Sequence, residues 1–179
     1  VTDRLDYQAD GAGYLRGIRK HLFVLDVATK ACRQVTRGDW HAGDPSWSPD
    51  GTKLAFAAAT AADADLTYRA PLYVVDASSE AAEPEPAGLA DGVGGAITWN
   101  ADGSALVAVG WAGGPVGHAG LHRVPLGGGE PTDLAAPLDR NVMQGGAGYP
   151  GGPPQRSTGN TIVFCARDRG CTSLYAVDG

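Results

Sequence analysis

Short apolar runs recur along the chain and are separated by turn residues. In residues 53–59, KLAFAAA, Leu54 and Phe56 fall on one face of an extended strand and small alanines fall on the other, before the run becomes wholly apolar. This pattern is typical of a strand whose two faces are both covered. Similar runs lie at residues 104–109 and 161–164. Because no 3.6-residue period typical of an amphipathic helix is present, the pattern predicts an all-β chain.

These elements return at a regular spacing. Residues 47–51 read WSPDG, and residues 99–103 read WNADG, 52 positions later. A second signature, an apolar run that opens with leucine, starts 50, 49 and 53 residues apart at 22–26, 72–76, 121–125 and 174–178. Two hairpins joined by a linker in about 50 residues are what one four-stranded propeller blade requires. The repeats therefore predict a β-propeller.

The turn residues fit the same interpretation. Pro49 presets φ for the first position of a tight turn, and Gly51 accepts the left-handed conformation that such a turn requires. Gly92, Gly94 and Gly95 precede the ITW motif at 97–99, where the chain is expected to enter an inner strand. Small residues are expected there, because backbones crowd together near a propeller axis.

The repeats predict a partial ring. We expect about 3.6 four-stranded blades, with repeats at roughly residues 1–40, 41–90, 91–139 and 140–179. Closed propellers have about four to eight blades, so these residues do not close the ring alone. The final run also stops before an outermost strand of the kind expected at residues 33–36. We therefore expect the remainder of a longer polypeptide to complete the ring, with self-association of copies as the alternative.

Composition and charge narrow the function. The 179 residues include 27 Gly and 12 Pro, which predicts many turns, and 43% hydrophobic residues, which suffices for a core. The net charge is −6, and cations cluster only at Arg16, Arg19 and Lys20, so we expect no nucleic-acid partner. No apolar run is long enough to cross a bilayer, and we expect no signal peptide before Val1. A soluble protein without a membrane partner is therefore expected.

A longer stretch of sequence carries a family resemblance. Residues 43–56 read GDPSWSPDGTKLAF and follow HLFVLDVAT at 21–29 and VTRG at 35–38. Together with the lead-in YQADGAGY at 7–14, they resemble the propeller of prolyl oligopeptidase family (S9) serine peptidases, in the acylaminoacyl-peptidase-like branch. The resemblance covers nearly the whole chain, although its repeats are shared with other propellers.

The resemblance implies a two-domain enzyme. Its propeller gates the access of short peptides, N-acylated peptides included, to a C-terminal α/β-hydrolase domain that holds Ser, Asp and His. The remainder of the polypeptide and peptide substrates are the implied partners, and the cytoplasm is the implied compartment. The catalytic domain is absent from these residues.

The serines agree with this division of roles. A nucleophile elbow reads Gly-x-Ser-x-Gly. Ser104 follows Gly103, but Leu106 stands where the second glycine is required, and no other serine fits the motif. We therefore assign no catalytic, cofactor-binding or metal-binding residue to the chain, and we expect no cofactor.

Two other functions are compatible with a propeller. The WSPDG repeat is also similar to that of TolB-like periplasmic propellers, which implies a protein-binding module without catalysis. A propeller glycosidase would need paired carboxylates facing inward near the axis. Asp44, Asp50 and Asp102 instead lie in or beside predicted turns, so this is the least favoured of the three.

The histidines are assigned structural roles. His118 and His122 are four residues apart, but one lies in a glycine-rich linker and the other in a predicted strand, so they do not form a zinc pair. His41 is expected at a blade rim, and His21 opens a strand. No cluster of carboxylates or thiols with ligand spacing accompanies any of the four.

Three further features have both a functional and a structural interpretation. Asp63 and Asp65 could bind calcium, but two carboxylates are too few ligands, and a solvated loop is favoured. Trp111 is the candidate contact residue toward a catalytic domain or substrate, its alternative role being an apolar cap on its own blade. The glycine clusters lack the Lys-Ser/Thr of a phosphate loop and are interpreted as turns: 127–129, 145–146 and 151–152.

The three cysteines cannot all pair with one another. Cys165 and Cys171 flank residues 166–170, a predicted hairpin tip, and a disulfide across its two strands is a hypothesis based on this spacing alone. A reduced pair is the alternative, and the family resemblance favours it.

Overall fold

The computed structural model describes residues 5, 7–10, 13–15, 17–79, 82–146 and 149–179. Gly11, Ala12 and Arg16, which belong to the lead-in and to the basic group noted above, lie outside the described residues. The described chain is almost entirely β, with one short 3₁₀ helix, η1 (Ala136–Leu138). This agrees with the absence of a helical period in the sequence.

The strands form antiparallel sheets of the size expected for propeller blades. The first sheet has two strands, β3 (Phe23–Leu25) and β4 (Cys32–Gln34). The second and third sheets have four strands each and contain, in order, β5 (Ser46–Trp47), β6 (Lys53–Ala57), β7 (Leu72–Asp76), β8 (Glu85–Gly88) and then β9 (Val93–Trp99), β10 (Ala105–Trp111), β11 (Gly120–Pro125), β12 (Thr132–Asp133). The fourth sheet has three strands: β13 (Gln155–Arg156), β14 (Thr161–Asp168) and β15 (Cys171–Asp178).

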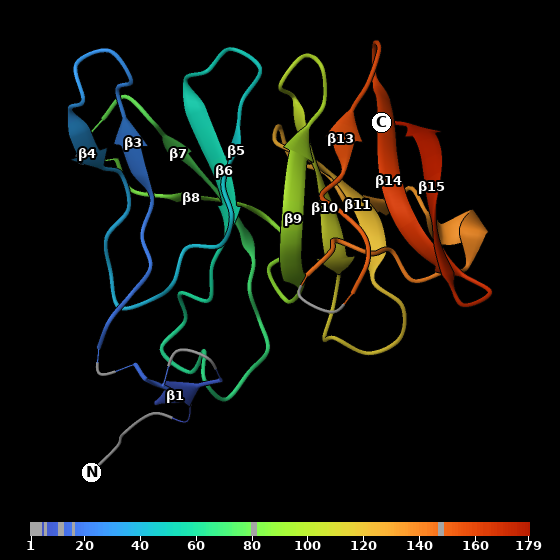
Figure 1. Ribbon diagram of the computed structural model, residues 1–179, viewed down its shortest axis with the longest axis horizontal. Coiled ribbons are helices and arrows are strands. Elements are labelled where there is room, and N and C mark those ends of the chain that lie inside the picture. The colour runs from blue at the N-terminus through green and yellow to red at the C-terminus, as the bar shows by residue number, and fades with distance from the viewer. Residues whose placement is uncertain (1–4, 6, 11–12, 16, 80–81, 147–148) are drawn as a thin grey trace.

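These four sheets follow one another side by side, and a small separate hairpin of β1 (Gln8–Ala9) and β2 (Gly13–Tyr14) lies away from them (Figure 1). The innermost strands of the sheets are neighbours, because β9 contacts both β5 and β13. A parallel bridge between Ala70 and Val93 also ties the second sheet to the third. The chain is therefore a partial β-propeller, as the repeats predicted.

Each strand in the middle of the arc packs against two neighbouring sheets. On β6, Leu54 and Phe56 belong to the apolar cluster shared with the first sheet, whereas Ala55 and Ala57 belong to the cluster shared with the third. Strand β10 divides its residues in the same way between the second and fourth sheets. Both faces are thus covered, which explains why these strands are wholly apolar instead of alternating with polar residues.

Glycines make the tight turns between the first and second strands of the second, third and fourth sheets. Gly51, Gly103 and Gly159 have φ of 71°, 74° and 64°. This conformation is strained for residues with a side chain, so the predicted turns are confirmed at all three places. The turn of the fourth sheet keeps its glycine even though its preceding residues have lost the WSPDG pattern.

The hypothesis of a Cys165–Cys171 disulfide is wrong. All three cysteines are free, and the register of β14 and β15 places Cys165 opposite Leu174 and Cys171 opposite Asp168. The physical reason is the length of the turn. Arg169 and Gly170 alone form it, with φ of 48° and 82°, so pairing begins earlier than a five-residue tip would allow. An offset of three residues puts the two thiols at different levels and on opposite faces of the hairpin.

Candidate functional site

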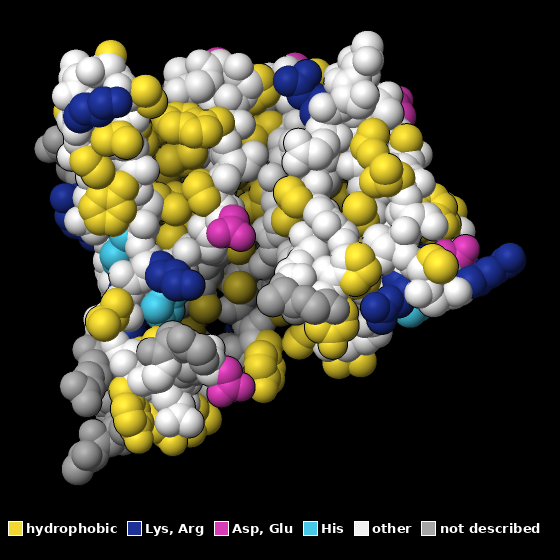
Figure 2. All heavy atoms as spheres, viewed as in Figure 1, with side chains coloured by type: hydrophobic (Ala, Val, Ile, Leu, Met, Phe, Trp, Pro, Cys, Tyr) yellow, Lys and Arg dark blue, Asp and Glu magenta, His cyan; other side chains and the backbone are white. Residues whose placement is uncertain are grey.

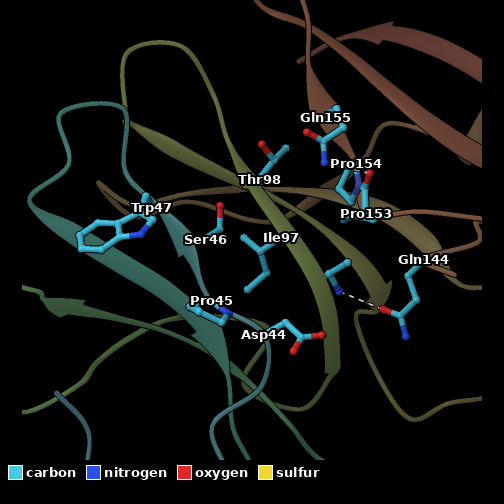
Figure 3. A pocket seen from close by; sticks show the side chains of 11 residues that line it. Asp44, Pro45, Ser46, Trp47, Ile97, Thr98, Gln144, Pro153, Pro154 and Gln155 are labelled. Carbon is cyan, nitrogen blue, oxygen red and sulfur yellow. Dashed lines mark hydrogen bonds between the residues drawn. The ribbon is translucent and has the colours of Figure 1, made fainter. Parts of the chain in front are cut away.

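The inner strands line a groove that faces the axial side of the arc. A hollow of about 380 Å³ lies between β5, β9 and the segment leading into β13. Figure 3 shows its polar side chains on the three strands and on the loops beside them, with prolines between them. Its lining residues include Asp44, Ser46, Thr98, Gln144 and Gln155. A smaller hollow of about 220 Å³ shares Asp44 and Gln144 and continues along Gly94 and Gly95. We call these two hollows together the axial groove.

Gln144 fixes the loop before β13 against β9. Its Oε1 accepts a hydrogen bond from the backbone N–H of Ala96 at 2.9 Å, which is drawn in Figure 3. A Cβ at Gly95 would overlap this amide oxygen, and a Cβ at Gly94 would overlap the side chain of Leu72. Both glycines therefore allow close approach, which confirms the expectation of crowding at the entry to the inner strand.

Trp99 fastens β9 to β5. Its indole Nε1 donates a hydrogen bond to the backbone carbonyl of Ser46 at 3.0 Å, and the side chain is only 4% exposed. Trp47 occupies the equivalent position one sheet earlier, because Trp47 pairs with Leu54 as Trp99 pairs with Leu106. The Trp47 side chain, however, is 50% exposed. The same motif thus gives a buried residue in one sheet and an exposed one in the sheet before it.

Replacing Trp99 with phenylalanine is expected to lower the free energy of unfolding by about 1–2 kcal/mol, because it removes a buried hydrogen bond between two sheets. Trp47→Phe is the matched control and is expected to change it by less than about 0.5 kcal/mol in the isolated chain. Urea unfolding of both variants measures the difference. Equal effects of the two substitutions would contradict the inter-sheet role of Trp99.

The polar groups of the axial groove suit binding better than bond cleavage. The side chains supply one carboxylate, two hydroxyls, two amides and the indole N–H of Trp47. Ser46 has no histidine among the residues that line the groove, so no nucleophile with a neighbouring base is present there. Across the described part of the chain, no group of three or more His, Cys, Asp or Glu residues is placed to hold a metal ion. Hydroxyls and amides do hydrogen-bond well to a peptide backbone.

The carboxylates of the turns are structural. The Ser48 hydroxyl, followed by the backbone and hydroxyl of Thr52, lowers the pKa of Asp50 to about 2. Hydrogen bonds from Ser104 lower the pKa of Asp102 below its usual value in the same way. A glycosidase needs one carboxylic acid whose pKa is raised so that it can donate a proton. Asp50 and Asp102 have the opposite property, so they do not support a glycosidase.

Three of the histidines make contacts within the scaffold. His122 is 7% exposed, and its Nε2 lies 3.1 Å from the carbonyl oxygen of Gly110. His21 contacts the Thr36 hydroxyl at 3.2 Å and the Gly38 carbonyl at 3.1 Å. His41 accepts a hydrogen bond on Nδ1 from the backbone N–H of Lys20 at 3.0 Å. His118 is exposed in a loop.

The remaining candidates lie away from the axial groove. Trp111 ends β10, packs against the cluster between the third and fourth sheets, and donates from Nε1 to the Gly117 carbonyl at 3.2 Å. Asp65 accepts a hydrogen bond from the backbone N–H of Leu5 at 2.7 Å, and Asp63 is exposed beside it. Trp111 and Asp65 therefore make local contacts, and none of the three residues lines the axial groove.

Gln144, Thr98 and Gln155 line the groove although no sequence motif marks them as site residues. Gln144 and Gln155 lie in or beside glycine- and proline-rich segments that resemble ordinary loops. The alternation along β9 was the one available signal, since Thr98 is a polar residue in an otherwise apolar inner strand.

Solved structures with a similar fold include peptidases and TolB proteins. The Pyrococcus horikoshii acylaminoacyl peptidase matches with a TM-score of 0.64 and 15% identity, over 100% of this chain and 26% of the peptidase. TolB from Acinetobacter baumannii matches with a TM-score of 0.57 and 19% identity, over 88% of this chain and 35% of TolB. A prolyl endopeptidase structure matches with a TM-score of 0.56 and 15% identity, over 88% of this chain and 24% of that chain.

These likenesses show the propeller fold. The chain spans between about a quarter and about a third of the length of the three proteins. No protein-family model and no curated protein sequence matches the chain. No helix in the described part of the chain has the length and apolar character needed to cross a bilayer.

Proposed function

We propose that the chain is the non-catalytic propeller portion of a serine peptidase, in which it controls the access of short peptides to a hydrolase domain of the same polypeptide. The observation that carries the proposal is the likeness to the acylaminoacyl peptidase. It extends over 100% of the chain with a TM-score of 0.64, whereas the likeness to A. baumannii TolB extends over 88% with a TM-score of 0.57. N-acylated peptides are the substrate class that this likeness favours.

The axial groove supports a role in admission. Its wall is made of inner-strand backbone, glycines that allow the strands close approach, and the neutral polar side chains of Ser46, Thr98, Gln144 and Gln155 beside a single carboxylate. Such a wall offers hydrogen bonds to a passing peptide backbone without a strong charge that would retain it. The width of the passage then depends on how firmly the segments beside the axis are held.

Gln144 is the residue through which this admission role can be tested. Gln144→Ala removes the hydrogen bond that holds the loop before β13 against Ala96. In the complete polypeptide that contains these residues, the variant is expected to raise the ratio of kcat/KM for a peptide of about thirty residues to that for an N-acetyl dipeptide anilide by about threefold or more. The loss of a hydrogen bond of about 1 kcal/mol reduces by a factor of this size the population of molecules in which the loop is held against β9.

Gln34→Ala is the matched control, because Gln34 also donates a side-chain hydrogen bond to a backbone carbonyl, that of Thr36, but does so on β4, away from the axis. The control is expected to leave the ratio unchanged. An equal ratio in both variants would exclude gating by this loop. Absence of any hydrolysis by the complete polypeptide would exclude the peptidase itself.

The second candidate is a TolB-like module that binds a protein partner and catalyses nothing. The match to TolB, at 19% identity, favours it. An active-site probe for serine hydrolases distinguishes the two functions: covalent labelling of the complete polypeptide supports the peptidase, and absence of labelling supports the binding module.

A further inference from the structure

Strand β3 has an open edge where the corresponding strands of other sheets have a neighbour. Strand β7 pairs with both β6 and β8, and β11 pairs with both β10 and β12, whereas β3 pairs with β4 alone within the described residues. On the side of β4, the carbonyl of Leu22 accepts a hydrogen bond from the backbone N–H of Val35, and the N–H of Asp26 donates one to the carbonyl of Ala31. Backbone groups alternate along a strand, so those of Phe23 and Leu25 point to the open edge. This edge is free to pair with another strand.

Trp47, on the inner strand of the second sheet, has no indole hydrogen bond within the described residues, whereas its equivalent Trp99 has one. Trp99 donates to a carbonyl on the inner strand of the preceding sheet, Ser46. For Trp47 the preceding sheet is the first one, which consists of β3 and β4 and has no inner strand among the described residues. Trp47 also borders the axial groove, and Figure 3 shows its indole extending to the side away from Ile97. We attribute the 50% exposure of the Trp47 side chain to the absence of this inter-sheet contact among the described residues.

The surface between β3 and β6 is apolar. Figure 2 shows hydrophobic side chains gathered on the visible face between the places that Figure 1 gives to these two strands. The cluster beneath it includes Val24, Leu54 and Phe56. By its equivalence to Trp99, Trp47 is on the side of β5 toward the first sheet. We call the apolar floor, the open edge of β3 and this side of β5 together the open slot.

We propose that the open slot binds a two-stranded β-hairpin of the β5–β6 type. The repeat itself indicates this occupant. In the second sheet, β5 and β6 form one hairpin with a tight glycine turn, and this hairpin pairs with the inner edge of β7. In the third sheet, β9 and β10 form the same kind of hairpin and pair with β11. The second strand of the hairpin pairs with β3, and a carbonyl of its first strand accepts the hydrogen bond of Trp47 Nε1. The inference does not depend on peptidase activity, since it concerns how the first sheet is completed.

A second copy of the chain fits the slot less well. The open end of another copy would offer the fourth sheet, which has three strands. Added to β3 and β4, it would make five strands, one more than in the complete sheets. The hairpin β5–β6 of a folded copy is already paired to its own β7 and is not free to be donated. A separate hairpin avoids both difficulties.

Titration of the chain with a synthetic hairpin tests the proposal. The peptide has the sequence of residues 43–59 and carries Trp47→Phe, so that it adds no indole signal. Nitrogen-15 NMR spectra of the chain follow the Trp47 indole N–H and the exchange of the Phe23 and Leu25 amides with deuterium. We expect a saturable shift of the indole resonance and amide exchange slowed by about tenfold or more, because a paired amide exchanges only when its strand opens.

Three controls make the result specific. Trp47→Phe in the chain is expected to weaken binding of the hairpin by about fivefold, which is the loss of one hydrogen bond. Tyr68→Ala, at an exposed aromatic residue in the loop between β6 and β7, is expected to leave binding unchanged. A peptide of the same composition in scrambled order is expected to produce neither effect.

The proposal is overturned by any of three results. One is the absence of both shift and protection at millimolar peptide, and another is equal binding of the scrambled peptide. The third is protection of Phe23 and Leu25 without peptide that grows with the concentration of the chain, which would identify a second copy as the occupant.

Discussion

Replacing Phe56 with alanine is expected to lower the free energy of unfolding by about 3–5 kcal/mol. Phe56 is 0% exposed, and its ring stacks between Trp40 and Tyr73 at centroid distances of 5.9 Å on each side. It joins the first sheet to the second through their shared apolar cluster. The substitution removes this contact area and leaves a cavity that two rigid aromatic neighbours cannot fill.

Phe23→Ala is the control for this prediction, because Phe23 is 58% exposed on the outer side of the first sheet. Its loss is expected to cost less than about 1 kcal/mol. Guanidinium unfolding followed by circular dichroism measures both variants. Similar midpoints for Phe56→Ala and Phe23→Ala would mean that the cluster between the first two sheets does not support the fold.

The second large effect is expected at Gly110, where alanine should cost about 1–3 kcal/mol. A Cβ at this position would overlap the backbone carbonyl of Val93 on the adjacent strand β9. The pairing of β10 with β9 shifts its register between Ala108 and Gly110, so the two backbones are closest at this irregularity. Because the obstacle is backbone, the strands themselves must move apart to accommodate the methyl group.

Gly114→Ala is the matched control, since nothing lies within 4 Å of a Cβ there. It is expected to be neutral or to stabilise the chain by a few tenths of a kcal/mol through the unfolded state. Thermal unfolding of the two variants compares them. A Gly110→Ala variant as stable as Gly114→Ala would contradict the close approach of β9 and β10.

The sequence predicts the repeating unit well because local rules determine it. Gly51, Gly103 and Gly159 lie at turns that need a positive φ, and the wholly apolar run around Phe56 is covered on both faces. These properties depend on neighbours within a few residues, or on a repeat that the whole chain shares.

Other features depend on contacts that no local pattern encodes. Gln144 reaches Ala96 across 48 positions, and nothing in its glycine-rich surroundings indicates this. Trp47 and Trp99 share a motif, yet one is exposed and the other buried, because burial depends on the sheet that comes before. The cysteine pairing failed for a similar reason, since a two-residue turn in place of a longer one moved Cys171 opposite Asp168.

The central claim is that this propeller arc belongs to a serine peptidase. It is tested most directly by the intact mass, under denaturing conditions, of the polypeptide that carries these residues in its native cells after treatment with a fluorophosphonate probe. We expect a mass several times the 18.3 kDa of the present chain, increased by one probe adduct on a serine outside residues 1–179. A mass near 18.3 kDa, or a larger polypeptide without an adduct, would contradict the peptidase.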